Sequence, residues 1–182
     1  MAKLISKTYG DALFEIAVEE NKTDLFLEEV SALLQIIKEN DEFQKFMDSP
    51  KIPKEEKLEM VQTIFKDRLD QDLLGFMITV IEKDRYTEIQ DILQYVIDEI
   101  KEYCSIGTAY ITTAAPLTSE EVKDVEKRLL ETTKYKTVEC VYQVDSSLIG
   151  GMVIRMKDRV VDSSIKTKLE KLERELLTIQ LS

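Results

Sequence analysis

The spacing of apolar residues changes once along the chain, near Cys104–Gly107, and this change constrains the fold more than any other feature. Before it, apolar residues recur at steps of three and four, which is typical of helices with one buried face. After it, apolar and polar residues alternate, which is typical of strands. We therefore expect an N-terminal all-α six-helix bundle over residues 1–105, followed by a small C-terminal α+β domain over residues 106–182.

Six helical segments account for the first region. Thr23 is placed to cap one of them, because a threonine hydroxyl can accept a free backbone N–H at a helix start. Pro53 suits the first position of another, where a missing N–H costs nothing. The expected helices are residues 3–20, a helix from Thr23 to about Ile37, Asp41–Met47, a helix that begins at Pro53, residues 70–83 and residues 87–104.

The second region mixes strands with two helices. Thr118 and Glu121 have the spacing of a capping box, and Asp162, Ser163 and Ser164 are typical of a helix start. The expected strands are Thr108–Ala115, Val138–Val144, Leu148–Met156 and Arg159–Val161, with one helix over Thr118–Thr132 and a closing helix after Ser164. The pair Gly150-Gly151 falls inside an expected strand, which predicts a bulge or the close approach of another backbone.

The charge of the chain divides along the same boundary. Residues 1–105 hold 13 Lys/Arg and 24 Asp/Glu, whereas residues 106–182 hold 12 of each. This acidic excess argues against nucleic acid and against direct docking on anionic lipid, since both favour clustered Lys and Arg. It serves either as a solvated surface or as a field that steers a basic partner segment towards the helical half.

Residues that carry chemistry are scarce. The chain has no histidine, which removes the commonest general base and metal ligand, and it contains no GxxxxGK[ST] phosphate loop. Cys104 and Cys140 are too few for a disulfide framework and are spaced unlike a zinc motif. We therefore expect no catalysis, no cofactor and no metal. No stretch approaches the roughly 20 apolar residues of a membrane span, and no secretion signal is evident, so a cytosolic location is expected.

Two segments are more apolar than an ordinary surface helix. The run Leu73–Ile81 belongs either to the central helix of the bundle or to a helix that keeps one face for a partner. The closing helix places Ile165, Leu169, Leu172, Leu176 and Ile179 at alternating steps of four and three. This seam favours a coiled-coil-like contact, or it packs on the sheet of its own domain.

At this point the sequence resembles a known family. The segment Ser147–Arg155 resembles the C-terminal signature of F-type ATP synthase delta subunits, the family of the mitochondrial oligomycin-sensitivity-conferring protein. Its residues include Gly150, Gly151 and Arg155, and the resemblance continues through Asp158, Val161, Asp162, Ser164, Ile165 and Leu169. Tyr9–Leu13 and Ser49–Ile52 resemble two further family segments, so essentially the whole chain is covered. Gly10 and Lys157 depart from the usual alanine and glycine.

The resemblance implies a stator subunit that joins the catalytic head to the peripheral stalk, on the cytoplasmic face of the membrane and bound to it only through the complex. In that family the helical domain holds the N-terminal helix of an alpha subunit between its first and fifth helices, here residues 3–20 and 70–83. The expected lining is Tyr9, Ala12, Ile16, Phe76, Met77 and Val80. The C-terminal domain would hold the b subunits of the stalk through Leu169, Leu172 and Leu176.

Two other functions are compatible with part of the pattern. A helix-binding adaptor in an unrelated complex would share every feature except the segment from Gly150-Gly151 to Ile165. A carboxylate-dependent hydrolase would need a concave site with perturbed carboxylates, and the absence of histidine weighs against it.

Overall fold

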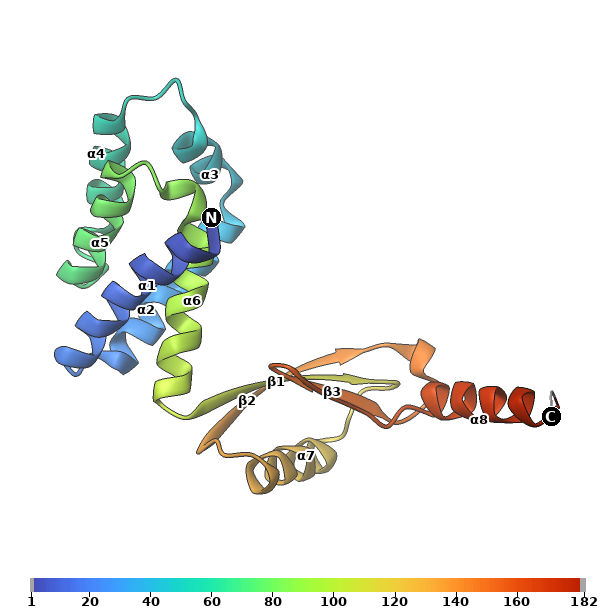
Figure 1. Cartoon of the computed structure of the whole chain (residues 1–182). Helices are drawn as coiled ribbons and strands as arrows, with labels where there is room; N and C mark the ends of the chain where they lie inside the picture. The colour runs from blue at the N-terminus through green and yellow to red at the C-terminus, as the bar shows by residue number, and fades with distance from the viewer. Residues whose placement is uncertain (1, 181–182) are drawn as a thin grey trace. The chain divides into compact units, whose positions relative to one another are not determined.

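A computed structural model of the chain describes the backbone of residues 2–180 and the side chains of residues 4–174. The chain divides into two compact units, one ending at Cys104 and the other beginning at Ser105. The first is helical and the second combines a sheet with helices, as the change of apolar period predicts (Figure 1). The division falls one residue before the expected boundary.

The helical unit is built around one core. Its elements are α1 (Ala2–Glu19), α2 (Thr23–Glu39), α3 (Asp41–Asp48), α4 (Lys54–Phe65), α5 (Gln71–Glu82), a short 3₁₀ turn (Tyr86–Glu88) and α6 (Ile89–Tyr103). Helix α6 lies at the centre, since both α1 and α2 pack mainly against it, while α5 packs mainly against α4. Fully buried side chains from several helices meet in this core, among them Phe26, Leu33, Leu73, Met77, Ile92 and Ile100.

The helix starts agree only in part with the sequence prediction. Thr23 is the first residue of α2 and makes no cap, because the preceding residue, Lys22, occupies the cap position without a side-chain bond. The expectation of a Thr23 cap is therefore wrong. Pro53 lies one residue earlier than expected, just before α4. In the other unit the capping box of Thr118 and Glu121 is present in both directions.

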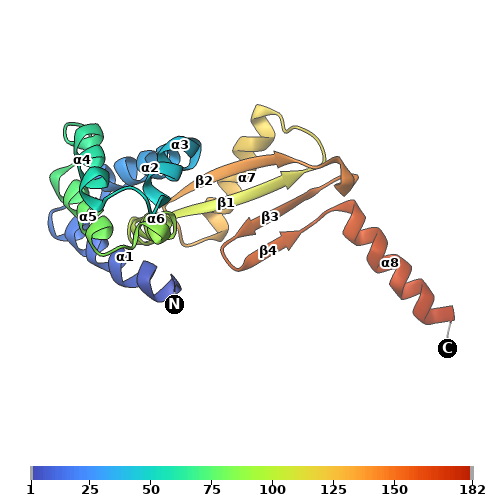
Figure 2. The same ribbon diagram turned by 90° about the horizontal axis from the view of Figure 1, so that it is seen from above.

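The C-terminal unit is a four-stranded sheet with α7 on one face. Its elements are β1 (Ile106–Thr113), α7 (Ser119–Thr132), β2 (Thr137–Val144), a 3₁₀ turn (Ser146–Leu148), β3 (Met152–Met156), β4 (Arg159–Asp162) and α8 (Ile165–Gln180). The strand order is β2-β1-β3-β4, with β1 parallel to β2 and the other pairs antiparallel (Figure 2). Val125 and Leu129 of α7 cover the buried Ala109 and Ile111 of β1.

The glycine pair forms a corner before β3 instead of lying inside a strand. Strand β3 begins at Met152 and not at Leu148, because Ile149 and Gly151 adopt φ values of 67° and 76°, outside the strand region. A Cβ on Gly151 would lie 2.5 Å from the Ser163 carbonyl oxygen, and one on Gly150 would lie 2.5 Å from the Ile165 side chain. The expected close approach of another backbone is therefore present at Gly151.

The two units are joined by a very short segment. Helix α6 ends at Tyr103 and β1 begins at Ile106, so only Cys104 and Ser105 lie between them. The Ser105 carbonyl already belongs to the second unit, because it accepts the backbone N–H groups of Lys136 (2.8 Å) and Thr137 (3.4 Å).

The corner should not tolerate a side chain at position 151. Gly151→Ala should destabilise the C-terminal unit by about 2–4 kcal/mol, because it adds both a left-handed backbone penalty and a collision with the Ser163 carbonyl. Ile149→Gly, at a neighbouring left-handed position whose side chain is 64% exposed, should raise stability by up to about 1 kcal/mol. Urea unfolding followed through the amide NMR signals of each unit separates the two domains. Equal stability of Gly151→Ala and the parent chain would contradict this account of the corner.

Candidate protein-binding surfaces

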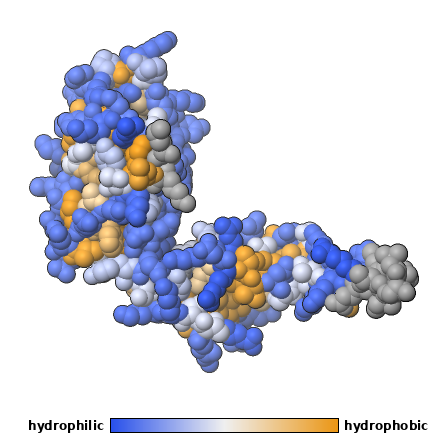
Figure 3. Space-filling view, viewed as in Figure 1, coloured by the Kyte–Doolittle hydropathy of each residue, from blue (hydrophilic) through white to orange (hydrophobic). Residues whose placement is uncertain are grey.

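A groove runs between α1 and α5 on the surface of the helical unit. It has a volume of about 580 Å³ and is lined by Thr8, Tyr9, Ala12 and Ile16 of α1 and by Gln71, Asp72, Gly75, Phe76 and Thr79 of α5. Figure 3 shows apolar and weakly polar side chains gathered over these two helices, between the hydrophilic side chains that cover most of the unit. The groove is therefore an apolar surface in an otherwise charged domain, which is typical of a protein-binding site.

The base of the groove is apolar. Tyr9, Ile16 and Phe76 are partly or largely buried and also pack on the core, so they form a firm base. The Thr8 hydroxyl donates to the Leu4 carbonyl and the Thr79 hydroxyl donates to the Gly75 carbonyl, both at 2.9 Å. Because each hydroxyl bonds within its own helix, the groove presents few unsatisfied polar groups to an apolar ligand.

The α1 wall is held from behind by α6. The Tyr95 hydroxyl on α6 donates to the Asp11 carboxylate of α1 at 2.7 Å, and this hydrogen bond raises the pKa of Tyr95. The Tyr95 ring also lies where a Cβ of Gly10 would be, which explains why glycine stands at this position of α1. Both contacts are on the side of α1 that faces α6.

The α5 wall is fixed at its first turn. Asp70 caps the helix by accepting the Asp72 backbone N–H at 2.9 Å, and the Asp70 backbone N–H in turn donates to Glu29 at 2.8 Å. The Lys22 ammonium donates to Asp70 at 3.1 Å. The backbone hydrogen bond from Asp72, together with Lys22, lowers the pKa of Asp70. Hydrogen bonds to Glu20 and Asp70 raise the pKa of Lys22. The charged forms of Asp70 and Lys22 therefore secure the start of α5.

Four of the six residues expected in the groove line it: Tyr9, Ala12, Ile16 and Phe76. Met77 and Val80 do not, since both are fully buried in the core. Their prediction is corrected: α5 turns them inward, behind the groove. The residues that the prediction missed are Thr8, Gln71, Asp72, Gly75 and Thr79. Part of this set could have been predicted from helical spacing. Thr8 lies four residues before Ala12, and Thr79 four residues after Gly75, so each pair shares one face of its helix.

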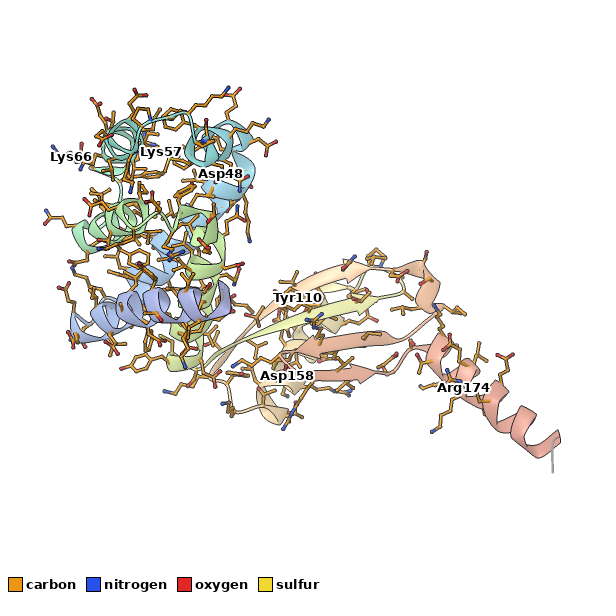
Figure 4. The ribbon with its side chains drawn as sticks, turned by 45° about the horizontal axis from the view of Figure 1, so that its top comes forward. Asp48, Lys57, Lys66, Tyr110, Asp158 and Arg174 are labelled. Atoms are coloured by element: carbon orange, nitrogen blue, oxygen red, sulfur yellow. The ribbon has the colours of Figure 1, made fainter. Side chains whose placement is uncertain are left out.

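A second exposed apolar surface lies on α8. Leu169 and Leu172 are 51% and 55% exposed, and Ile165 is also exposed. Figures 1 and 4 show α8, up to the labelled Arg174, continuing past the end of the sheet and not lying against it. Packing of this seam on its own sheet is therefore excluded for the described side chains. Leu176 lies outside the residues whose side chains the structure describes.

The expected signature residues support the corner that starts α8. Gly150 and Gly151 allow the close contacts described above, and Asp162 accepts the Ser164 backbone N–H at 2.8 Å and the Thr167 hydroxyl at 2.7 Å. These hydrogen bonds lower the pKa of Asp162, and the bond from Thr167 has the largest effect. Arg155 is different, because it is exposed on β3 opposite Tyr110 of β1.

No metal site is found among the described residues. No group of three or more His, Cys, Asp or Glu side chains there could hold a metal ion. A further hollow of about 430 Å³ near Asp48 and Lys57 (Figure 4) has balanced charges, and its Lys54 donates to Asp84 at 2.7 Å. Within the described residues, no helix combines the length and apolar character needed to cross a membrane.

Comparisons with known proteins agree over nearly the whole chain. The family described as ATP synthase delta (OSCP) subunit matches residues 5–176. ATP synthase subunit delta of Lachnoclostridium phytofermentans is 46% identical over 181 residues, with 100% of both chains covered. That of Clostridium beijerinckii is 31% identical over 177 residues, covering 97% of this chain and 98% of the relative. A chain of the Toxoplasma gondii mitochondrial ATP synthase hexamer has the same fold, with a TM-score of 0.73 at 18% identity over 94% of this chain and 97% of that one.

The anchor of the α5 wall yields a prediction with a pH dependence. Asp70→Ala should lower stability by about 1–2 kcal/mol at pH 7, because it removes the cap, whereas Asp70→Asn should cost less because asparagine also caps. The folded-state pKa of Asp70 is depressed, so its ionic contribution is present above its unfolded pKa of about 4 and is lost as pH falls through the folded pKa. Urea unfolding should therefore show the gap between the parent chain and Asp70→Asn shrinking below about pH 4. A gap that does not change with pH would contradict a lowered pKa of Asp70 in the folded chain.

Proposed function

The chain belongs to the ATP synthase delta (OSCP) subunit family and is therefore a non-catalytic stator subunit of an F-type ATP synthase, and we propose that it holds its two neighbours through two separate surfaces. The α1–α5 groove receives the N-terminal helix of an alpha subunit, and α8 receives the ends of the b subunits. The adaptor in an unrelated complex is not favoured, because relatives with the delta-subunit name align along the full chain.

The apolar groove is the observation that carries the first half of the proposal. It lies in the helical unit, which contains α1 to α6. An amphipathic helix binds such a groove by burying apolar anchors at helical spacing. Tyr9, Ile16 and Phe76 offer the apolar base for these anchors, while Ala12 and Thr8 leave room beside α1. Asp72 at the rim, in a half of the chain with 24 acidic and 13 basic residues, favours a helix with basic residues on its flanks.

The exposed seam of α8 supports the second half. Leu169 and Leu172 are three residues apart and both exposed, so an α-helix from another chain can pack along them as in a coiled coil. Two interfaces on one chain also add an effective-concentration benefit, since a complex that opens at one surface stays held at the other. A part that resists sustained load benefits from this slow dissociation more than from fast association.

The location follows from the same proposal. As part of the complex, the protein lies on the cytoplasmic face of the cell membrane and is attached to it only through its partners. The strong acidic excess of the helical half supports this indirect attachment, because anionic lipid repels such a surface.

The groove assignment is tested by placing a charge in it. Ala12→Asp should weaken binding of a peptide from the N-terminus of the same organism's alpha subunit at least 100-fold, because the carboxylate is buried against apolar anchors. Ala32→Asp makes the same change on the exposed part of α2 and should leave the affinity unchanged. Calorimetric titration of the full chain gives both values, and binding should show a negative heat-capacity change. Tight binding by Ala12→Asp would contradict the groove assignment.

The α8 assignment is tested in the same way with the other partner. The double variant Leu169→Asp/Leu172→Asp should weaken binding to the soluble part of the b subunits at least tenfold, while binding of the alpha-subunit peptide stays unchanged. Glu170→Ala/Glu173→Ala is the control on the same helix, because both side chains are exposed beside the seam. Retained b-subunit binding by the leucine variant, measured by titration of the full chain, would remove α8 from the interface.

A further inference from the structure

One glycine has no explanation within the chain itself. Gly75 lies in the middle of α5 and is exposed. Glycine in a helix interior costs stability relative to alanine, because the unfolded chain loses more conformational freedom on folding. The backbone of Gly75 is not left-handed, and a Cβ added to it would meet no atom within 4 Å. Neither conformation nor packing in the free chain therefore requires a glycine here.

The other four glycines of the chain differ on this point. A Cβ on Gly10 would collide with the Tyr95 ring, one on Gly107 would lie 2.5 Å from the Tyr135 ring, and the corner pair has the close neighbours already described. Each of these positions is thus filled by the chain's own atoms. Only at Gly75 does the missing side chain leave open space, and that space is part of the α1–α5 groove.

The residues around this space have small side chains or hydroxyls that are already hydrogen-bonded. Ala12 lines the groove from α1, and Thr79, one turn further along α5, has its hydroxyl bonded to the Gly75 carbonyl at 2.9 Å. Phe76, which is only 9% exposed, also lines the groove. The open space over Gly75, beside Ala12 and Thr79, is therefore an apolar seat for a large side chain of another molecule. The Thr79 hydroxyl does not compete with such a side chain, because it is already hydrogen-bonded.

We propose that Gly75 is the point at which the docked helix approaches α5 most closely, with a large apolar side chain of that helix seated over Gly75 between Ala12 and Thr79. This inference rests on the proposed function, in which the occupant is the N-terminal helix of the alpha subunit. It adds a requirement on that helix: one of its anchors must be a bulky apolar residue. The glycine is a specificity determinant whose cost to the free protein is recovered only in the complex.

The test separates folding from binding in the full chain. Gly75→Ala should raise the thermal midpoint of the helical unit by about 2–6 °C, because alanine favours the helix and nothing obstructs its methyl group. The same change should weaken binding of the alpha-subunit peptide at least tenfold. Gly75→Leu, whose side chain fills the seat, should weaken it at least 100-fold. Ala32→Gly is the inverse exchange at an exposed helical site, and it should lower the midpoint and leave the affinity unchanged.

The outcomes distinguish this inference from the function on which it rests. If the parent chain binds the peptide and Gly75→Ala binds it equally well, the inference is overturned and the groove assignment stands. A lowered midpoint for Gly75→Ala would also overturn it, because the glycine would then serve the free fold. If the folded parent chain does not bind the peptide, the proposed function fails and the inference fails with it. Higher stability combined with weaker binding supports both.

Discussion

The binding surface of the helical unit depends on how its helices share their contacts. Helix α1 packs mainly on α6 and α5 packs mainly on α4, so these two helices line the same groove while hardly contacting each other. The Tyr95–Asp11 hydrogen bond holds one wall and the Asp70 cap with Lys22 holds the other. Because both walls are secured from behind, we expect the groove to be preformed, so that binding would not require its walls to separate.

The spacing of apolar residues was sufficient to predict the helices but not which residues of α5 face away from the core. Leu73–Ile81 is apolar around most of its circumference, so the pattern could not decide which residues face the core. The structure turns Met77 and Val80 inward and leaves Gly75 and Thr79 in the groove. A hydrophobicity pattern gives no weight to glycine and little to threonine, although small residues are what allow a neighbouring helix to approach. The α1 side was easier, because Tyr9, Ala12 and Ile16 form one short row at helical spacing.

The C-terminal unit shows a second limit of sequence patterns. The apolar content of Leu148–Met156 favours one strand, yet the backbone geometry at Ile149 and Gly151 delays the strand until Met152. An isoleucine at positive φ has no reliable sequence signal, since β-branched residues rarely adopt it. The capping residues Thr118 and Asp162 were predictable, because their hydrogen bonds are local. The exposure of the α8 seam was not predictable, because the spacing of its apolar residues does not reveal whether the surface that packs on them belongs to the same chain or to another.

The connection between the two units has a mechanical consequence. Cys104 and Ser105 are the two residues between α6 and β1, and the Ser105 carbonyl is fixed by two backbone hydrogen bonds, from Lys136 and Thr137. A fully extended chain spans only about 3.3–3.6 Å per residue, so this link can lengthen by no more than a few ångströms. Tension carried along the chain from α6 therefore reaches β1 with little extension of the link between them. The link between the two units therefore acts as a joint that bends more readily than it stretches.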